Sequence, residues 1–210
     1  MIKKLFFVAA LFIYFSFNAF AADNTTGLDI TLKTDKQAYD PGSAINIEVT
    51  FKNSSASDLR ILETGCYKGQ DFKFFGSGGN GIQWDGRAHT VKLSAYPGQT
   101  HLIKPAESYT VKFGAFITKD RRLIFENHSE TVATGYYPGT DKKDDIPDKY
   151  IGCGRFFDLK NPGKFQISYE YKKKESDMEW NVIAPEGSDR SLDKLWLGDT
   201  VSQTVEIEIK

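Results

Sequence analysis

Acidic and imidazole side chains alternate in one short stretch of this 210-residue chain. Glu126, His128 and Glu130 would point to the same side of an extended strand, because successive side chains of a strand alternate between its faces. Two carboxylates and an imidazole form a donor set that binds Zn²⁺ or another divalent ion. The stretch is polar throughout, so the same residues also fit a segment that faces water. We keep these three residues as candidate metal ligands and expect no bound metal and no cofactor.

The chain contains two cysteines, Cys66 and Cys153. In an oxidising compartment the two would form one disulfide, which restricts the unfolded chain. The alternative is a reactive thiol at Cys153, which lies between two glycines with no histidine close in the sequence. We expect the disulfide and no catalytic residues. A small secreted enzyme or metal-binding protein that uses Cys153, or Glu126 with His128, remains the alternative.

Two further motifs have simple structural interpretations. Residues 76–81 match G-x-G-x-x-G, but a dinucleotide site needs this motif between a strand and a helix, and no helix start follows. The glycines therefore predict the tip of a hairpin. Four aspartates lie in one loop without the spacing of a calcium-binding EF-hand, and lysines lie among them: Asp141, Asp144, Asp145 and Asp148. They indicate a solvated loop.

The first 21 residues have the pattern of a secretory signal. Lys3 and Lys4 precede an apolar run over residues 5–17, and Ala19-Phe20-Ala21 fits a cleavage site. The run is shorter than the ~20 residues that span a bilayer comfortably. An uncleaved anchor is the alternative. We expect cleavage, no stable membrane insertion afterwards, and a periplasmic or secreted protein over residues 22–210.

The charge balance argues against several classes of partner. Without Lys3 and Lys4, 25 basic residues remain from 27 against 28 acidic ones, a net charge of about −3. Proteins that bind nucleic acid usually carry a basic stripe, and anionic membranes attract basic segments. We therefore expect neither partner. With 40% hydrophobic and 14% aromatic residues, the chain can bury a core, and its length suits a single elaborated domain.

Alternating apolar and polar residues predict an all-β fold. A turn at Asp40-Pro41-Gly42 leads into residues 44–52, where every second side chain is apolar. Similar strands are expected at residues 28–32, 59–62, 71–75, 90–95, 108–115, 122–125, 151–159, 165–171 and 205–209. At most one short helix is expected, within residues 188–197, and one long polar loop, over residues 135–149. About ten short strands indicate two packed antiparallel sheets.

Two segments resemble immunoglobulin-like sandwich modules. Residues 34–42, with the strand that follows to Asn53, are similar to the opening of macroglobulin-type domains and of bacterial exported immunoglobulin-like modules. Residues 158–167 resemble a strand start of such modules, which recurs in the non-catalytic sandwich that precedes deuterolysin-like (aspzincin) protease domains. No His-Glu-x-x-His motif is present, so the resemblance implies the immunoglobulin-like fold and no protease chemistry.

The leading functional prediction is an exported, non-catalytic protein that binds another protein. Loops of a sandwich commonly carry recognition, and exposed aromatic side chains dominate binding energy. The candidate contacts are Tyr136, Tyr137, Trp84 and Phe75, each of which also fits a buried or turn-bracing role. Proteinase inhibition is one version that the resemblance implies. Another is an accessory subunit that adds a strand to its partner.

Overall fold

The computed structural model describes residues 27–63, 71–86, 99–126, 146–147, 150, 155–174 and 194–210, except for the side chains of residues 63, 84–86, 99 and 155. These residues form strands and turns with no α-helix, which confirms the prediction of an all-β chain. Nothing in the described part is a helix long and apolar enough to cross a membrane.

The predicted turn at Pro41-Gly42 leads into an interior strand of the first sheet. Gly42 has φ 85°, a conformation that a glycine adopts without steric cost, and the Ser43 N–H donates to the Asp40 carbonyl over 3.2 Å. Strand β3 (Ala44–Asn53) follows and alternates between buried and exposed side chains, as expected. It pairs antiparallel with β1 (Leu28–Thr34) on one side and with β9 (Ser108–Ile117) on the other.

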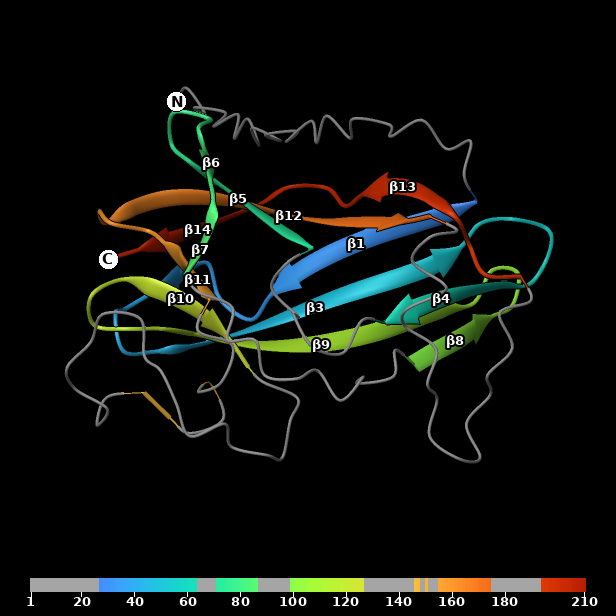
Figure 1. The fold of residues 1–210 in the computed structure, drawn as a ribbon, viewed down its shortest axis with the longest axis horizontal. Helices are drawn as coiled ribbons and strands as arrows, with labels where there is room; N and C mark the ends of the chain where they lie inside the picture. The colour runs from blue at the N-terminus through green and yellow to red at the C-terminus, as the bar shows by residue number, and fades with distance from the viewer. Residues whose placement is uncertain are drawn as a thin grey trace, which may run out of the picture.

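The strands form two large sheets and one small sheet (Figure 1). Sheet 1 has the order β1, β3, β9, β10 (Arg122–Phe125), β11 (Arg155–Asp158) and β7 (Trp84–Gly86). Sheet 2 has the order β2 (Ala38–Tyr39), β14 (Val205–Ile209), β12 (Gly163–Lys173), β5 (Phe72–Gly76) and β6 (Gly81–Ile82), and β13 (Gly198–Val201) pairs with β12. The small sheet pairs β4 (Leu59–Glu63) with β8 (Gln99–Ile103).

Aromatic side chains from the two large sheets meet in the main core. The ring of Phe72 in β5 lies 5.1 Å from that of Phe113 in β9, measured between centroids, and 4.7 Å from that of Phe125 in β10. Phe51 in β3 meets Tyr169 in β12 edge to face at 5.8 Å. Such ring pairs add stabilisation beyond the apolar area that they bury. Sheets 1 and 2 therefore pack face to face.

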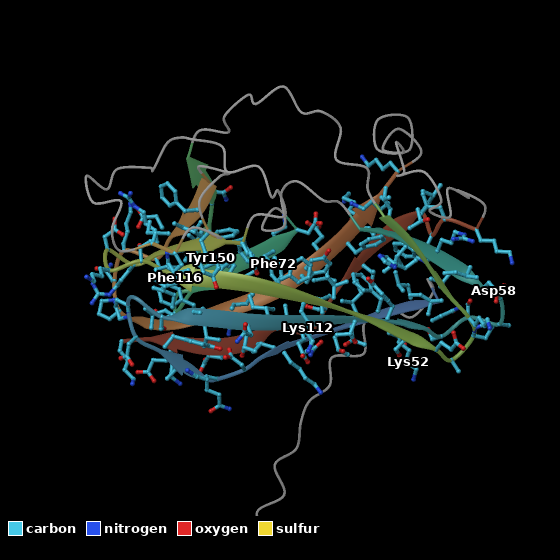
Figure 2. All side chains as sticks on the ribbon, turned by 90° about the horizontal axis from the view of Figure 1, so that it is seen from below. Lys52, Asp58, Phe72, Lys112, Phe116 and Tyr150 are labelled. Atoms are coloured by element: carbon cyan, nitrogen blue, oxygen red, sulfur yellow. The ribbon has the colours of Figure 1, made fainter. Side chains whose placement is uncertain are left out.

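A second hydrophobic cluster covers the outer face of sheet 1. It consists of Phe116, Ile124, Ile146, Tyr150 and Phe156. The rings of Phe116 and Tyr150 stack with centroids 5.4 Å apart, and Figure 2 shows the two side by side. Ile146 belongs to the long loop predicted over residues 135–149, and it is 7% exposed. The later part of this loop is therefore packed against the sheet at Ile146.

A buried amide organises one end of the molecule. Asn53 is 0% exposed, and its Nδ2 donates to the carbonyls of Ser57 and Ile103 over 2.8 and 2.9 Å. Its Oδ1 accepts from the N–H and the hydroxyl of Ser55. Because all of these groups are satisfied, the amide fixes the turn after β3 and connects it to β8.

Some elements differ from the sequence-based expectations. No helical turn occurs in residues 194–197, the described part of the segment where one was expected. Instead Leu195 forms a parallel bridge with Arg60 of β4, and the Trp196 N–H donates to the Arg60 carbonyl over 2.7 Å. Strands β2, β6, β7, β8 and β13 were not predicted, and the strand expected at residues 90–95 lies outside the described residues.

A charged turn connects β1, β2 and β3. The Asp35 carboxylate accepts from the Tyr39 hydroxyl over 2.7 Å and from the Asn46 N–H and Nδ2 over 3.0 and 3.1 Å. Burial, with the hydrogen bond to Asp35, raises the pKa of Tyr39 to about 12. Burial alone would raise the pKa of Asp35, but the hydrogen bonds from Tyr39 and Asn46 outweigh it and hold the pKa below its ordinary value.

We expect this carboxylate to make stability depend on pH. A pKa that is lower in the folded than in the unfolded state contributes stability above the unfolded value of about 3.9, and this contribution is lost as the pH falls through the folded pKa. Urea unfolding between about pH 6 and pH 2 should show a smaller loss of stability on acidification for Asp35→Asn than for the wild type. Tyr39→Phe, which removes one donor, should lie between the two. Equal pH profiles for all three proteins would contradict this account.

A second prediction concerns a close contact at the start of β13. A Cβ atom added to Gly198 would lie 2.8 Å from Cη2 and 2.9 Å from Cζ2 of Trp196, whose ring packs 5.6 Å from that of Tyr171. Gly198→Ala should therefore displace the indole and lower the free energy of unfolding by about 1–3 kcal/mol, measured by urea denaturation.

The matched control is Gly76→Ala in β5, where an added Cβ meets nothing within 4 Å. It should change stability by less than about 0.5 kcal/mol. Losses of equal size in the two variants would mean that the contact with Trp196 is not the cause.

Candidate functional site

The last two strands pair with β12 in different registers. Val201 of β13 lies opposite Glu170, whereas Val205 of β14 lies opposite Ile167. The segment from β13 to β14 therefore contains one residue more than the part of β12 that it faces. Ser202 adapts to this bulge: its N–H donates to the Tyr169 carbonyl over 2.8 Å, and its hydroxyl accepts from the Tyr169 N–H over 2.9 Å. The ladder to β12 is thus continued by a side chain where the backbone is out of register.

The next residue, Gln203, connects the two large sheets. Its Nε2 donates to the Leu32 carbonyl over 2.9 Å, and its Oε1 accepts from the Leu32 N–H over 3.3 Å. Leu32 lies in β1, the edge strand of sheet 1. The Gln203 amide therefore presents to this edge the donor and acceptor that a neighbouring strand would present.

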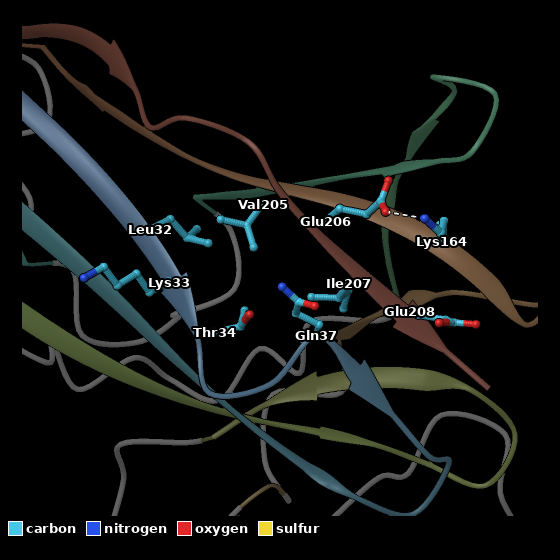
Figure 3. Close-up of a pocket in the computed structure, with 9 residues that line it drawn as sticks. All are labelled: Leu32, Lys33, Thr34, Gln37, Lys164, Val205, Glu206, Ile207 and Glu208. Atoms are coloured by element: carbon cyan, nitrogen blue, oxygen red, sulfur yellow. Dashed lines mark hydrogen bonds and ion pairs between the residues drawn. The ribbon is translucent and has the colours of Figure 1, made fainter. Parts of the chain in front are cut away.

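Beyond this bridge a groove opens between β1 and β14. Its volume is about 500 Å³, within the range of small-ligand sites. The lining residues, shown in Figure 3, are Leu32, Lys33, Thr34, Gln37, Lys164, Val205, Glu206, Ile207 and Glu208. Leu32 and Ile207 are each 1% exposed, so Val205 supplies the partly exposed apolar surface of the floor.

Among the described residues, some backbone groups of both strands that face this groove have no hydrogen-bond partner. In β14 the N–H of Glu208 donates to the Gln37 carbonyl over 2.7 Å, so the N–H and C=O of Glu206, two residues earlier, face the same side, where β2 no longer extends. In β1 the backbone N–H and C=O of Thr34 face the same side as those of Leu32, because the two residues are two positions apart in the strand. Among the described residues, no hydrogen bond satisfies these groups of Thr34 and Glu206.

Charged side chains line both rims of the groove. Lys164 forms an ion pair with Glu206 over 2.7 Å, and this hydrogen bond together with the Glu206 charge raises the pKa of Lys164. The pair is exposed, so it contributes little to stability. Lys33 on β1 lies opposite Glu48 of β3, and Glu208 on β14 lies opposite Lys164, whose pKa the Glu208 charge also raises. Figure 3 shows Lys33 and Glu208 at opposite ends of the groove.

Phe75, a predicted contact residue, lies apart from this groove. It is half-buried in β5, opposite Gly81 of β6 and Gln166 of β12. The neighbouring Phe74 is 1% exposed in the core, so Phe75 points to the outer face of sheet 2. The turn that follows is closed by the Gly76 N–H donating to the Asn80 carbonyl over 3.0 Å, which confirms the predicted hairpin tip.

The other predicted site residues are not brought together by the described structure. Trp84 lies in β7, and its side chain is outside what the structure describes, as are Cys66, Cys153, Tyr136, Tyr137, His128 and Glu130. Glu126 follows β10, where its N–H donates to the Gly114 carbonyl over 2.8 Å. No group of three His, Cys, Asp or Glu residues that could hold a metal occurs among the described residues. The disulfide, the metal ligands and the signal peptide therefore remain predictions.

Comparisons with known proteins give no family. No family model matches the chain, and no curated protein is similar to it. Among solved structures, the chain is similar to a β-glucosidase from Erythrobacter marinus, with 11% identity and a TM-score of 0.33, and to a β-glucosidase from Listeria innocua in complex with gluconolactone, with 13% identity and a TM-score of 0.30. The alignments cover 87% of this chain but only 15% and 16% of those chains.

Proposed function

We propose that this chain is an exported, non-catalytic interaction protein that binds an extended segment of another protein in the groove between β1 and β14. The observation that carries the proposal is the set of unused backbone groups of Thr34 and Glu206 beside the Gln203 amide. An extended peptide offers donors and acceptors along its length, and sheet edges recognise such segments through main-chain hydrogen bonds.

Gln203 supports the choice of a peptide as the ligand. Its side-chain amide bonds to both backbone groups of Leu32, so the β1 edge already accepts one amide of the chain itself. Thr34 is the next residue of β1 whose groups face that side, and it lines the groove. A bound segment would continue the pairing that Gln203 begins. This is the accessory, strand-adding version of the binding function.

We propose further that the fold is an immunoglobulin-like sandwich. In such domains one sheet contains the order A-B-E and the facing sheet the order C-F-G. The orders β1-β3-β9 and β5-β12-β14 support this assignment, because the strands of each order ascend along the chain, as A-B-E and C-F-G do, and the two sheets share a core. The pairing of β10 departs from the usual pattern, since β10 follows β9 in the chain whereas strand D precedes strand E.

Export and the disulfide are part of the same proposal and have a direct test. If residues 1–21 are removed and Cys66 pairs with Cys153, the protein recovered from its native compartment should begin at Ala22. Intact mass should rise when a thiol alkylating reagent is added after reduction, and should stay unchanged when the reagent is added without reduction. Alkylation of both cysteines without reduction would refute the disulfide.

The binding proposal predicts protection of two backbone amides. We would add a pool of acetylated, amidated pentapeptides Xaa-Val-Thr-Val-Xaa, with Xaa drawn from Asp, Glu, Lys, Arg and Gln, to the isotope-labelled full chain. Hydrogen exchange followed by NMR should slow at the N–H groups of Thr34 and Glu206, because the bound peptide accepts from them. Amides at the β5–β6 tip serve as an internal reference and should keep their exchange rates.

The matched control is the same pool with N-methylated valines. These peptides keep their side chains, but the methyl groups remove the donors on one edge of the peptide strand and block its approach there, so at least one of the two amides should lose its protection. Exchange rates at Thr34 and Glu206 that the unmodified pool does not change, or that the two pools change equally, would refute strand binding in the groove.

A further inference from the structure

We infer that the groove selects extended segments that carry an acidic and a basic residue about four positions apart, with an aliphatic residue between them. This inference rests on the proposed peptide-binding function and names the chemistry of the segment. It is carried by the positions of Lys33, Val205 and Glu208 along the groove.

Two sets of hydrogen bonds align the walls of the groove. Leu32 is level with Gln203 through the paired amide bonds, and Gln37 is level with Glu208 through the bond from the Glu208 N–H. Both strands therefore advance in the same direction from the bridge toward β2. Lys33 lies at the bridge end and Glu208 at the β2 end, separated along the groove by about four residues, or roughly 13 Å at the rise of a strand.

The charges at these two ends are opposite, and each has one cross-strand neighbour of opposite sign. Lys33 lies opposite Glu48, which pairs with Lys112, and Glu208 lies opposite Lys164, which pairs with Glu206. Lys33 is exposed on the rim formed by sheet 1, and Glu208 is exposed on the rim formed by sheet 2. The group of Lys33, Glu48 and Lys112 therefore carries a net positive charge, and the group of Lys164, Glu206 and Glu208 carries a net negative one. A bound segment therefore meets a positive charge at the bridge end and a negative charge at the β2 end. Electrostatic complementarity places an acidic residue near Lys33 and a basic residue near Glu208.

The strand geometry of a bound segment fits this spacing. Side chains at positions i, i+2 and i+4 of a strand point to one side, and those at i+1 and i+3 point to the other. With the charged positions i and i+4 at the rims, the intermediate side chains face the floor. There Val205 offers partly exposed apolar surface, and Leu32 and Ile207 lie buried beneath. An aliphatic side chain at these positions removes apolar area from water.

Three single peptides test the inference: acetylated, amidated Glu-Val-Thr-Val-Lys, Lys-Val-Thr-Val-Glu and Gln-Val-Thr-Val-Gln. Affinities for the full chain would be measured by NMR titration at low salt. One of the two charged peptides should bind more tightly than the neutral peptide, by about two- to fivefold for each ion pair that it forms with the groove. The peptide with the opposite charge order should bind more weakly than the neutral peptide. The preferred order reports the direction of the bound segment.

Charge reversal provides the decisive comparison. The double variant Lys33→Glu with Glu208→Lys should prefer the other charged order. The control variant Asp58→Lys with Lys194→Asp reverses an exposed ion pair whose two residues do not line the groove, and should keep the wild-type preference. If all three peptides bind the wild type equally, the charge selection is wrong while peptide binding stands. If no peptide binds, the proposed function itself fails.

Discussion

The arrangement of the groove depends on one extra residue between β13 and β14. The bulge at residues 202–204 lets a nearly continuous strand pair with both halves of β12, because the Ser202 hydroxyl replaces a backbone acceptor. It also turns Gln203 toward β1, where its amide joins the edge strand of one sheet to a strand of the other. Past this bridge the two edges separate, and Thr34 and Glu206 line the groove between them. A strand of regular register would place a different side chain opposite Leu32.

Much of the fold could be predicted from the sequence because its signals are local. The alternation in β3 and in β12, with the Pro-Gly turn before β3, specifies strands and their buried faces without knowledge of partners. Two of the strands that were missed illustrate the physical reason. Strand β8 follows Pro97-Gly98 with the mixed sequence Gln-Thr-His-Leu-Ile, and β13 begins at a glycine and contains an aspartate. These strands are held by pairing with β4 and β12, which local sequence does not reveal.

The groove could not be predicted, because its residues become neighbours only through sheet register. Lys33 and Glu208 look like ordinary exposed positions of alternating strands. The sequence around either residue does not indicate that the other lies in the same groove. Gln203 gives no signal on its own, since its role requires a bulge that appears only when β12 is aligned with both later strands. Lys173 shows the same limit: it belongs to a run of three lysines, yet it is 7% exposed with its ammonium 5.2 Å from the centre of the Tyr171 ring.

The position of β14 has a consequence for how the molecule is made. This strand is the last of the described chain, yet it lies between β2, near the beginning, and β12. During synthesis the nascent polypeptide cannot complete sheet 2 until Val205–Ile209 has left the ribosome, because contacts between distant parts of the sequence form late. A chain without these five residues would leave β2 and β12 without the strand that lies between them.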